Sequence, residues 1–132
     1  MNLLQCVNAY TAVQTMMSQQ MDYQTAYALV NLKRKLAPHA SFYQNKELEL
    51  VEEFAARDEE GKILWRDNGR FVFKDKEGAQ EFERRRKELD LVQVQEQFSL
   101  QRVPEPGIIR PVILEALEGF VEFFDRKVDE HG

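Results

Sequence analysis

The sequence predicts a single α+β domain over residues 1–132: a long kinked N-terminal helix, or a helical hairpin, packs on a small antiparallel sheet, and a C-terminal helix follows. Three observations predict this fold. Apolar residues recur at helical spacing through residues 22–57, turn residues separate two short apolar runs within residues 63–73, and an apolar stretch follows Pro111. A chain of 132 residues has room for one hydrophobic core.

Composition limits the class of protein. The net charge is −5 with both signs interspersed, which favours solubility and weakly disfavours unselective binding to nucleic acid or anionic membranes. The single cysteine, Cys6, excludes an intramolecular disulfide and stands among apolar residues, as a small core residue does. No run approaches the roughly 18 apolar residues of a membrane span, and the N-terminus has no secretory pattern. We therefore expect a cytoplasmic protein.

The long helix is the element on which the other elements are expected to pack. Asp22 is the expected N-cap. Pro38 lies inside the helix, where it removes a backbone donor and clashes with the carbonyl of Arg34, so we expect a kink or a break near residues 34–38. One apolar stripe runs along the helix through residues spaced by seven: Leu29, Leu36, Tyr43 and Leu50.

The N-terminal segment precedes this helix. Residues 1–7 are apolar and fit either a short strand or the entry to a helix. Residues 8–19 follow helical spacing, and Asn8 is the expected cap of that helix.

Residues 63–73 carry a hairpin signal. A two-residue turn at Asn68 and Gly69 pairs Trp65 with Val72. A three-residue loop with Gly69 in the left-handed conformation pairs Trp65 with Phe71 and Ile63 with Phe73 instead. We favour the second register, with Trp65 buried against the long helix, where alanine at this position is expected to cost about 3–5 kcal/mol. This register gathers the large side chains on one face: Ile63, Trp65, Phe71 and Phe73.

The last third of the chain predicts a helix, a strand and a second helix. Asp75 caps a helix that ends near Leu89. Residues 91–103 alternate apolar and polar, which predicts a half-buried strand beside residues 63–73. Pro111 suits the first turn of a C-terminal helix that continues to Val128.

No set of residues in the sequence predicts catalysis. The glycines are scattered and form no phosphate-binding loop. The two histidines, His39 and His131, are too few for a histidine-rich metal site. Nothing beyond the presence of Cys6 and His39 suggests that they form a nucleophilic Cys–His pair. We expect a non-enzymatic protein without a cofactor or a metal ion.

The apolar C-terminal helix predicts self-association. A monomer would leave part of this helix or of the long helix in water as a sizeable patch. We therefore expect a homodimer, or another protein partner, and the expected contact residues lie in the C-terminal helix: Phe120, Phe123 and Phe124.

Two basic runs leave nucleic-acid binding as the alternative function. Each run lies in a predicted helix. Acidic residues surround the second run, residues 84–87, so a solvated helix face with local ion pairs is favoured over a phosphate-binding site. The residues concerned are Lys33, Arg34, Lys35, Arg84, Arg85, Arg86 and Lys87.

The order of elements resembles a family of small proteins of unknown function encoded in tailed-phage and prophage genomes. The resemblance covers most of the chain, up to about Glu122, and this sequence departs from the family in Pro38 and in residues 123–132. It implies a phage or prophage context in a bacterial host, with a role in virion assembly or host interaction, and it carries no catalytic residues. The similar segments are residues 26–36, residues 58–61, residues 92–100, and a last motif made by Pro111, Leu114, Ala116, Leu117, Glu118 and Phe120.

Overall fold

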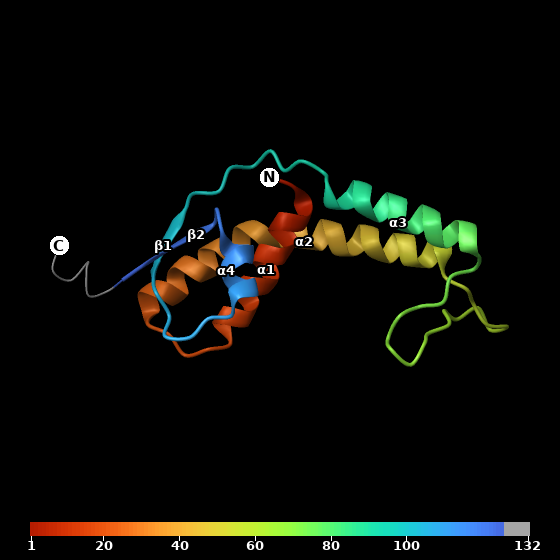
Figure 1. Ribbon diagram of the computed structural model, residues 1–132, viewed down its shortest axis with the longest axis horizontal. Helices are drawn as coiled ribbons and strands as arrows, with labels where there is room; N and C mark the ends of the chain where they lie inside the picture. Colours follow the sequence, from red (N-terminus) through yellow and green to blue (C-terminus); the bar gives the residue numbers. More distant parts are fainter. Residues whose placement is uncertain (126–132) are drawn as a thin grey trace.

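The computed structural model describes residues 1–125, which form an α+β fold made of a base and a projecting arm (Figure 1). None of the helices in this range is both long and apolar enough to cross a lipid bilayer. The elements in chain order are α1 (Leu3–Met17), α2 (Tyr23–Phe54), α3 (Lys76–Asp90), β1 (Gln101–Pro104), α4 (Pro111–Leu117) and β2 (Val121–Phe124).

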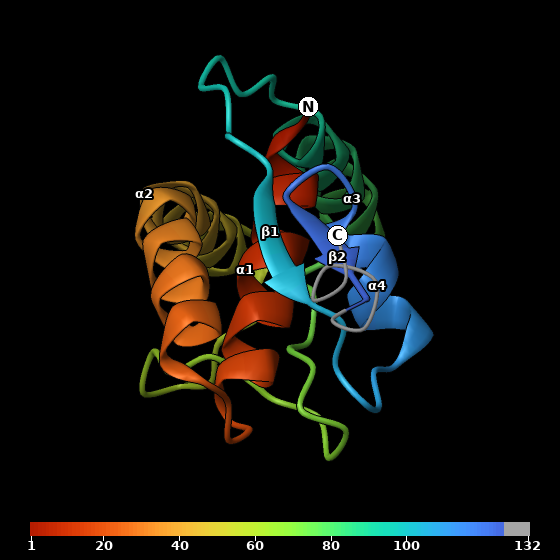
Figure 2. The same cartoon turned by 90° about the vertical axis from the view of Figure 1, so that its left-hand side faces the viewer.

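The base contains the main hydrophobic core. It is built by α1, the first half of α2, α4 and the two strands. These elements are grouped together in Figure 2. Cys6 is fully buried there, as its apolar neighbours predict. The largest fully buried side chains of this core come from α1, α2, β1, α4 and the turn before β2: Val13, Leu29, Leu32, Leu36, Val103, Leu117 and Phe120.

The first helix begins earlier than expected. Asn2, and not Asn8, caps α1, because its side chain accepts a hydrogen bond from the Gln5 N–H at 2.9 Å. The Gln5 side chain accepts in return from the Asn2 N–H at 2.8 Å. This reciprocal pair satisfies two backbone donors at once, which Asn8, one turn inside the helix, cannot do.

The long helix follows its heptad pattern. The Asp22 side chain accepts from the Thr25 N–H at 2.8 Å, so the predicted cap is confirmed. The stripe of Leu29, Leu36, Tyr43 and Leu50 is buried. Pro38 does not break the helix. It lies on the exposed face, where water can bind the carbonyl left without a helical donor.

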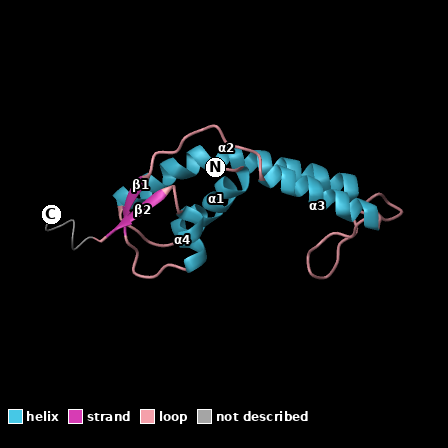
Figure 3. Ribbon diagram, turned by 45° about the horizontal axis from the view of Figure 1, so that its top comes forward, coloured by secondary structure: helices cyan, strands magenta, loops and turns pink. Residues whose placement is uncertain are grey.

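The arm is the second half of α2 packed against α3. α2 is longer than the base, so its C-terminal half extends beyond it, and α3 returns alongside (Figures 1 and 3). The Asp75 side chain accepts from the Gly78 N–H at 2.5 Å and caps α3 as predicted. A small cluster of Leu3, Tyr43 and Leu89 joins α1 to both arm helices where the arm leaves the base.

Residues 91–100 form an extended strap and not the predicted strand. Among the described residues, only Gln101–Pro104 of this region is a strand, and it pairs in parallel with Val121–Phe124. The expected antiparallel sheet is therefore wrong, and the α4 crossover allows the parallel pairing. The strap instead pairs with the N-terminus, since the Leu3 N–H donates to the Val92 carbonyl at 2.8 Å.

The C-terminal helix is shorter than predicted. α4 ends at Leu117, and Gly119 has φ +86°, a left-handed conformation that glycine adopts without strain. The chain then turns into β2, so residues 121–124 are strand and not helix. Val128, which the prediction placed in this helix, lies outside the described residues.

Candidate interaction site at the tip of the arm

Three short segments at the tip of the arm pair with one another in a closed ring. They are residues 55–57, 63–65 and 71–73, at the far end of the arm in Figures 1 and 3. The Ala56 N–H donates to the Val72 carbonyl at 2.7 Å, and the Val72 N–H donates to the Leu64 carbonyl at 3.0 Å. The Leu64 N–H closes the ring by donating to the Ala56 carbonyl at 2.9 Å.

The ring has an approximate threefold pattern with an eight-residue spacing. Outside the central bonds, the N–H groups of Asp58, Arg66 and Lys74 each donate across to a neighbouring segment. Each segment therefore pairs with both others, and its central residue directs its backbone N–H and C=O groups into the ring.

Two glycine turns connect the segments. Gly69 has φ +81°, and Trp65 pairs with Phe71, so the three-residue loop is confirmed over the two-residue turn. Ile63, however, pairs with Arg57 and not with Phe73. The cause lies at the end of the long helix: α2 ends at Phe54, three residues before the predicted end, and the released segment 55–57 enters the ring.

The aromatic residues of the tip form one continuous stack. Phe82 of α3 is 3% exposed, and the rings of Phe71 and Phe73 lie 5.2 and 5.3 Å from it, edge to face. Phe54 of α2 also contacts Phe82, edge to face, with the ring centres 6.3 Å apart. The stack therefore fastens the ring to both helices of the arm.

Trp65 lies at the outer end of this stack and is 60% exposed. Its ring contacts Phe71 edge to face at 6.5 Å. The expectation that Trp65 is buried against the long helix is therefore wrong, because Phe71, Phe73 and Phe82 already fill the space between the ring and the helices. Leu64, next to Trp65, is also exposed.

Two arginines accompany Trp65. Arg66 and Arg70 face each other across the Gly69 turn, with the Arg66 N–H donating to the Arg70 carbonyl at 2.7 Å. Both side chains are exposed, and neither makes an ion pair within residues 1–125. Asp67 belongs to the same turn, so the local charge is mixed with a basic excess. Sequence analysis missed this site, although each turn begins with a basic and an acidic residue and ends in glycine: Arg57, Asp58 and Gly61, then Arg66, Asp67 and Gly69.

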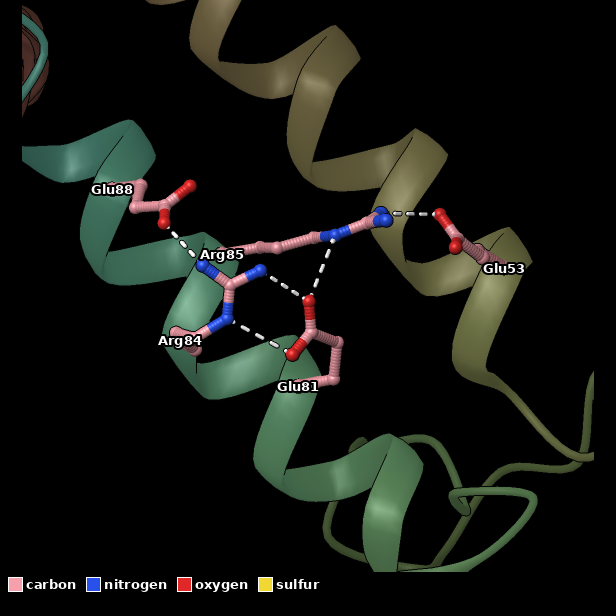
Figure 4. A network of polar contacts seen from close by, with 5 residues as sticks. All are labelled: Glu53, Glu81, Arg84, Arg85 and Glu88. Atoms are coloured by element: carbon pink, nitrogen blue, oxygen red, sulfur yellow. Dashed lines mark hydrogen bonds and ion pairs between the residues drawn. The ribbon is translucent and has the colours of Figure 1, made fainter.

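The second basic run is neutralised by carboxylates of the arm. Arg84 binds Glu81 and Glu88 on its own helix, while Arg85 reaches across to Glu53 of α2 at 2.6 Å (Figure 4). The hydrogen bond from Arg84 lowers the pKa of Glu81, which keeps this carboxylate ionised. The Arg85–Glu53 pair joins α3 to α2, and together these ion pairs leave little net positive charge for phosphates.

The remaining basic residues do not complete a nucleic-acid site. Arg86 binds Glu47 of α2 at 3.1 Å, and Lys87 is exposed on α3. The first run, Lys33 to Lys35, lies in the base, at least twelve residues or roughly 18 Å along α2 from Glu47. The structure therefore does not bring the two runs together.

The phenylalanines predicted as a partner contact do not form an exposed patch. Phe120 is 1% exposed and fills the core of the base. Phe123 is half-buried against the same core, and Phe124 is half-buried with the Arg102 guanidinium 4.9 Å above its ring. An exposed cluster at these three positions is therefore absent within the described residues.

His39 and Cys6 have separate contacts within residues 1–125. His39 binds Glu96 of the strap at 2.7 Å and contacts Phe98, and burial raises the pKa of the Cys6 thiol. No three His, Cys, Asp or Glu side chains in this part of the chain converge on a metal position. A groove of about 750 Å³ between α1 and α4 contains Glu115 and Glu118 as its ionisable side chains.

Comparison of the chain with protein-family models, curated proteins and solved structures finds no match. The resemblance to phage proteins therefore stays a prediction.

Proposed function

We propose that this chain is a non-enzymatic binding protein that holds a protein partner at the tip of its arm, as an assembly accessory of the kind that the phage resemblance implies. The observation that supports this function is Trp65, which is 60% exposed yet fixed at the end of an aromatic stack. A tryptophan in water contributes little to folding, whereas tryptophan and arginine dominate the binding energy of protein interfaces.

The backbone of the tip favours binding. The central hydrogen bonds of the ring hold the segment that carries Trp65, so less backbone entropy is lost on association. Arg66 and Arg70 add two cations beside the indole. The fitting partner is a protein surface with an apolar pocket for Trp65 and carboxylates on its rim.

The test uses Trp65 as its own reporter, because it is the only tryptophan in the chain. Tagged wild-type protein and Trp65→Ala are used for affinity purification from a bacterial host, and mass spectrometry identifies proteins recovered with the wild type alone. The purified partner is then titrated while Trp65 emission and its quenching by acrylamide are followed. Binding should shield the indole from acrylamide, and Trp65→Ala should weaken affinity at least about 30-fold.

Ile108→Ala is the matched control, because Ile108 is a large apolar residue that is 88% exposed in the base. It should leave the affinity unchanged. Recovery of the same proteins by Trp65→Ala and wild type would refute the proposed site. A mobility shift of nucleic acid that is lost with Arg84→Glu plus Arg85→Glu would favour the alternative function instead.

A further inference from the structure

A second surface lies where the arm leaves the base, in a groove between α2 and α3. Phe42 and Val92 both line this groove and are 48% and 43% exposed. Leu50 and Leu89 form its floor, and Leu91 next to it is also exposed. Within residues 1–125 the Lys46 ammonium lies over the Phe42 ring at 5.7 Å, but Phe42 and Val92 each keep more than two fifths of their surface exposed. Such a patch is costly in water.

The charges around Phe42 are arranged symmetrically along α2. Lys35 precedes Phe42 by seven residues and Glu49 follows it by seven, so all three lie on one face of the helix. All three side chains are exposed. Lys35 has no ion pair within the described chain, and Glu49 binds Lys46 at 3.1 Å with acceptor capacity to spare.

We propose that a second copy of this chain covers the groove, with the two α2 helices antiparallel about a twofold axis at Phe42. In that arrangement the Phe42 side chains of the two copies pack beside each other and toward the groove of the opposite copy. Lys35 of each copy meets Glu49 of the opposite copy. The charge order of the helix selects this orientation, because a parallel pair would place like charges together. A twofold contact uses each complementary pair twice.

The pairing also places the two tips at opposite ends of the dimer. The ends of the α2 helices at Phe54 lie twelve residues beyond Phe42, so they are roughly 36 Å apart. If the tips bind as proposed above, the dimer holds two partner sites and gains avidity for a repeated surface. Self-association itself does not depend on that function.

Light scattering after size exclusion tests the pairing over a range of concentrations. The wild type should have twice the mass of the 15.5 kDa chain, falling on dilution. Phe42→Ala, Lys35→Glu and Glu49→Lys should each shift the dissociation constant at least tenfold toward monomer. Melting curves followed by circular dichroism check that each variant is folded.

Charge exchange distinguishes this contact from any other. The double variant with Lys35→Glu and Glu49→Lys should dimerise again, and an equal mixture of the two single variants should form a mixed dimer. Lys76→Glu, a charge reversal at the other end of the arm, should leave the mass unchanged. A concentration-independent wild-type mass near 15.5 kDa, or single variants that remain fully dimeric, would overturn the proposal.

Discussion

At the scale of single residues, the side chains of the tip divide into those that hold the ring and those that are free to contact a partner. Phe82 belongs to the first group, since it is almost fully buried and contacts three other aromatic rings. Trp65 belongs to the second group, with a single ring contact. The largest aromatic residue of the chain is therefore not the one on which the tip depends.

Two alanine variants should show that Phe82, and not Trp65, carries the stability of the tip. Phe82→Ala removes the centre of the stack and should lower the free energy of unfolding by about 3–5 kcal/mol. Trp65→Ala should lower it by no more than about 1 kcal/mol, because most of the indole is already in water. Urea denaturation of both variants measures this difference, and equal losses would contradict the buried role given to Phe82.

The sequence predicts the turn correctly but not the side that Trp65 faces. Gly69 and its neighbours specify a local backbone geometry, and the pairing of Trp65 with Phe71 follows from it. Alternation along a hairpin places Trp65 on the same face as Phe71. It contains no information about the third segment, residues 55–57, which closes the ring and changes what that face packs against.

At the scale of elements, the caps of α2 and α3 and the heptad of α2 were predictable, whereas the cap of α1 and the pairing of residues 91–103 were not. Asp22 and Asp75 cap the helices that they were expected to cap, because capping depends on residues a few positions away. The alternation of residues 91–103 reports burial of one side, since Val94 and Phe98 pack on the core of the base. The alternation does not indicate whether a second strand lies beside the segment, and most of this segment has no neighbouring strand.

The junction of α2 and α3 depends on a hydrogen bond from Tyr43 to Asp90. The hydroxyl of the buried residue Tyr43 donates to Asp90 Oδ1 at 2.7 Å in a partly buried hydrogen bond. Tyr43→Phe should cost about 1 kcal/mol at neutral pH, measured by thermal unfolding. An unchanged melting temperature would show that water replaces this bond without loss.

The same hydroxyl predicts a pH dependence. Burial, and next the hydrogen bond to Asp90, raise the pKa of Tyr43 above its ordinary value of 10.0. The folded state therefore favours the neutral phenol, a contribution present below pH 10 and lost as the pH rises through the folded pKa. The stability difference between wild type and Tyr43→Phe should shrink above pH 10, and a difference that grows there would contradict this assignment.

At the scale of the whole molecule, base and arm have separate cores, and α2 runs through both. The core of the base includes α1, α4 and both strands, while the arm is held by the aromatic stack and by ion pairs between α2 and α3. Leu3, Tyr43 and Leu89 form the small junction between them. Opening of the arm therefore need not expose the core of the base.

Hydrogen–deuterium exchange of Phe82→Ala should reveal this division. Loss of the stack should speed exchange in residues 55–90, because the ring and α3 lose their main apolar contact, while protection in α1 and in β1 stays at the wild-type level. Leu117→Ala is the reciprocal control: it opens a cavity in the core of the base and should speed exchange in α1 and β1. Uniform acceleration along the whole chain in Phe82→Ala would mean that base and arm unfold as a single cooperative unit.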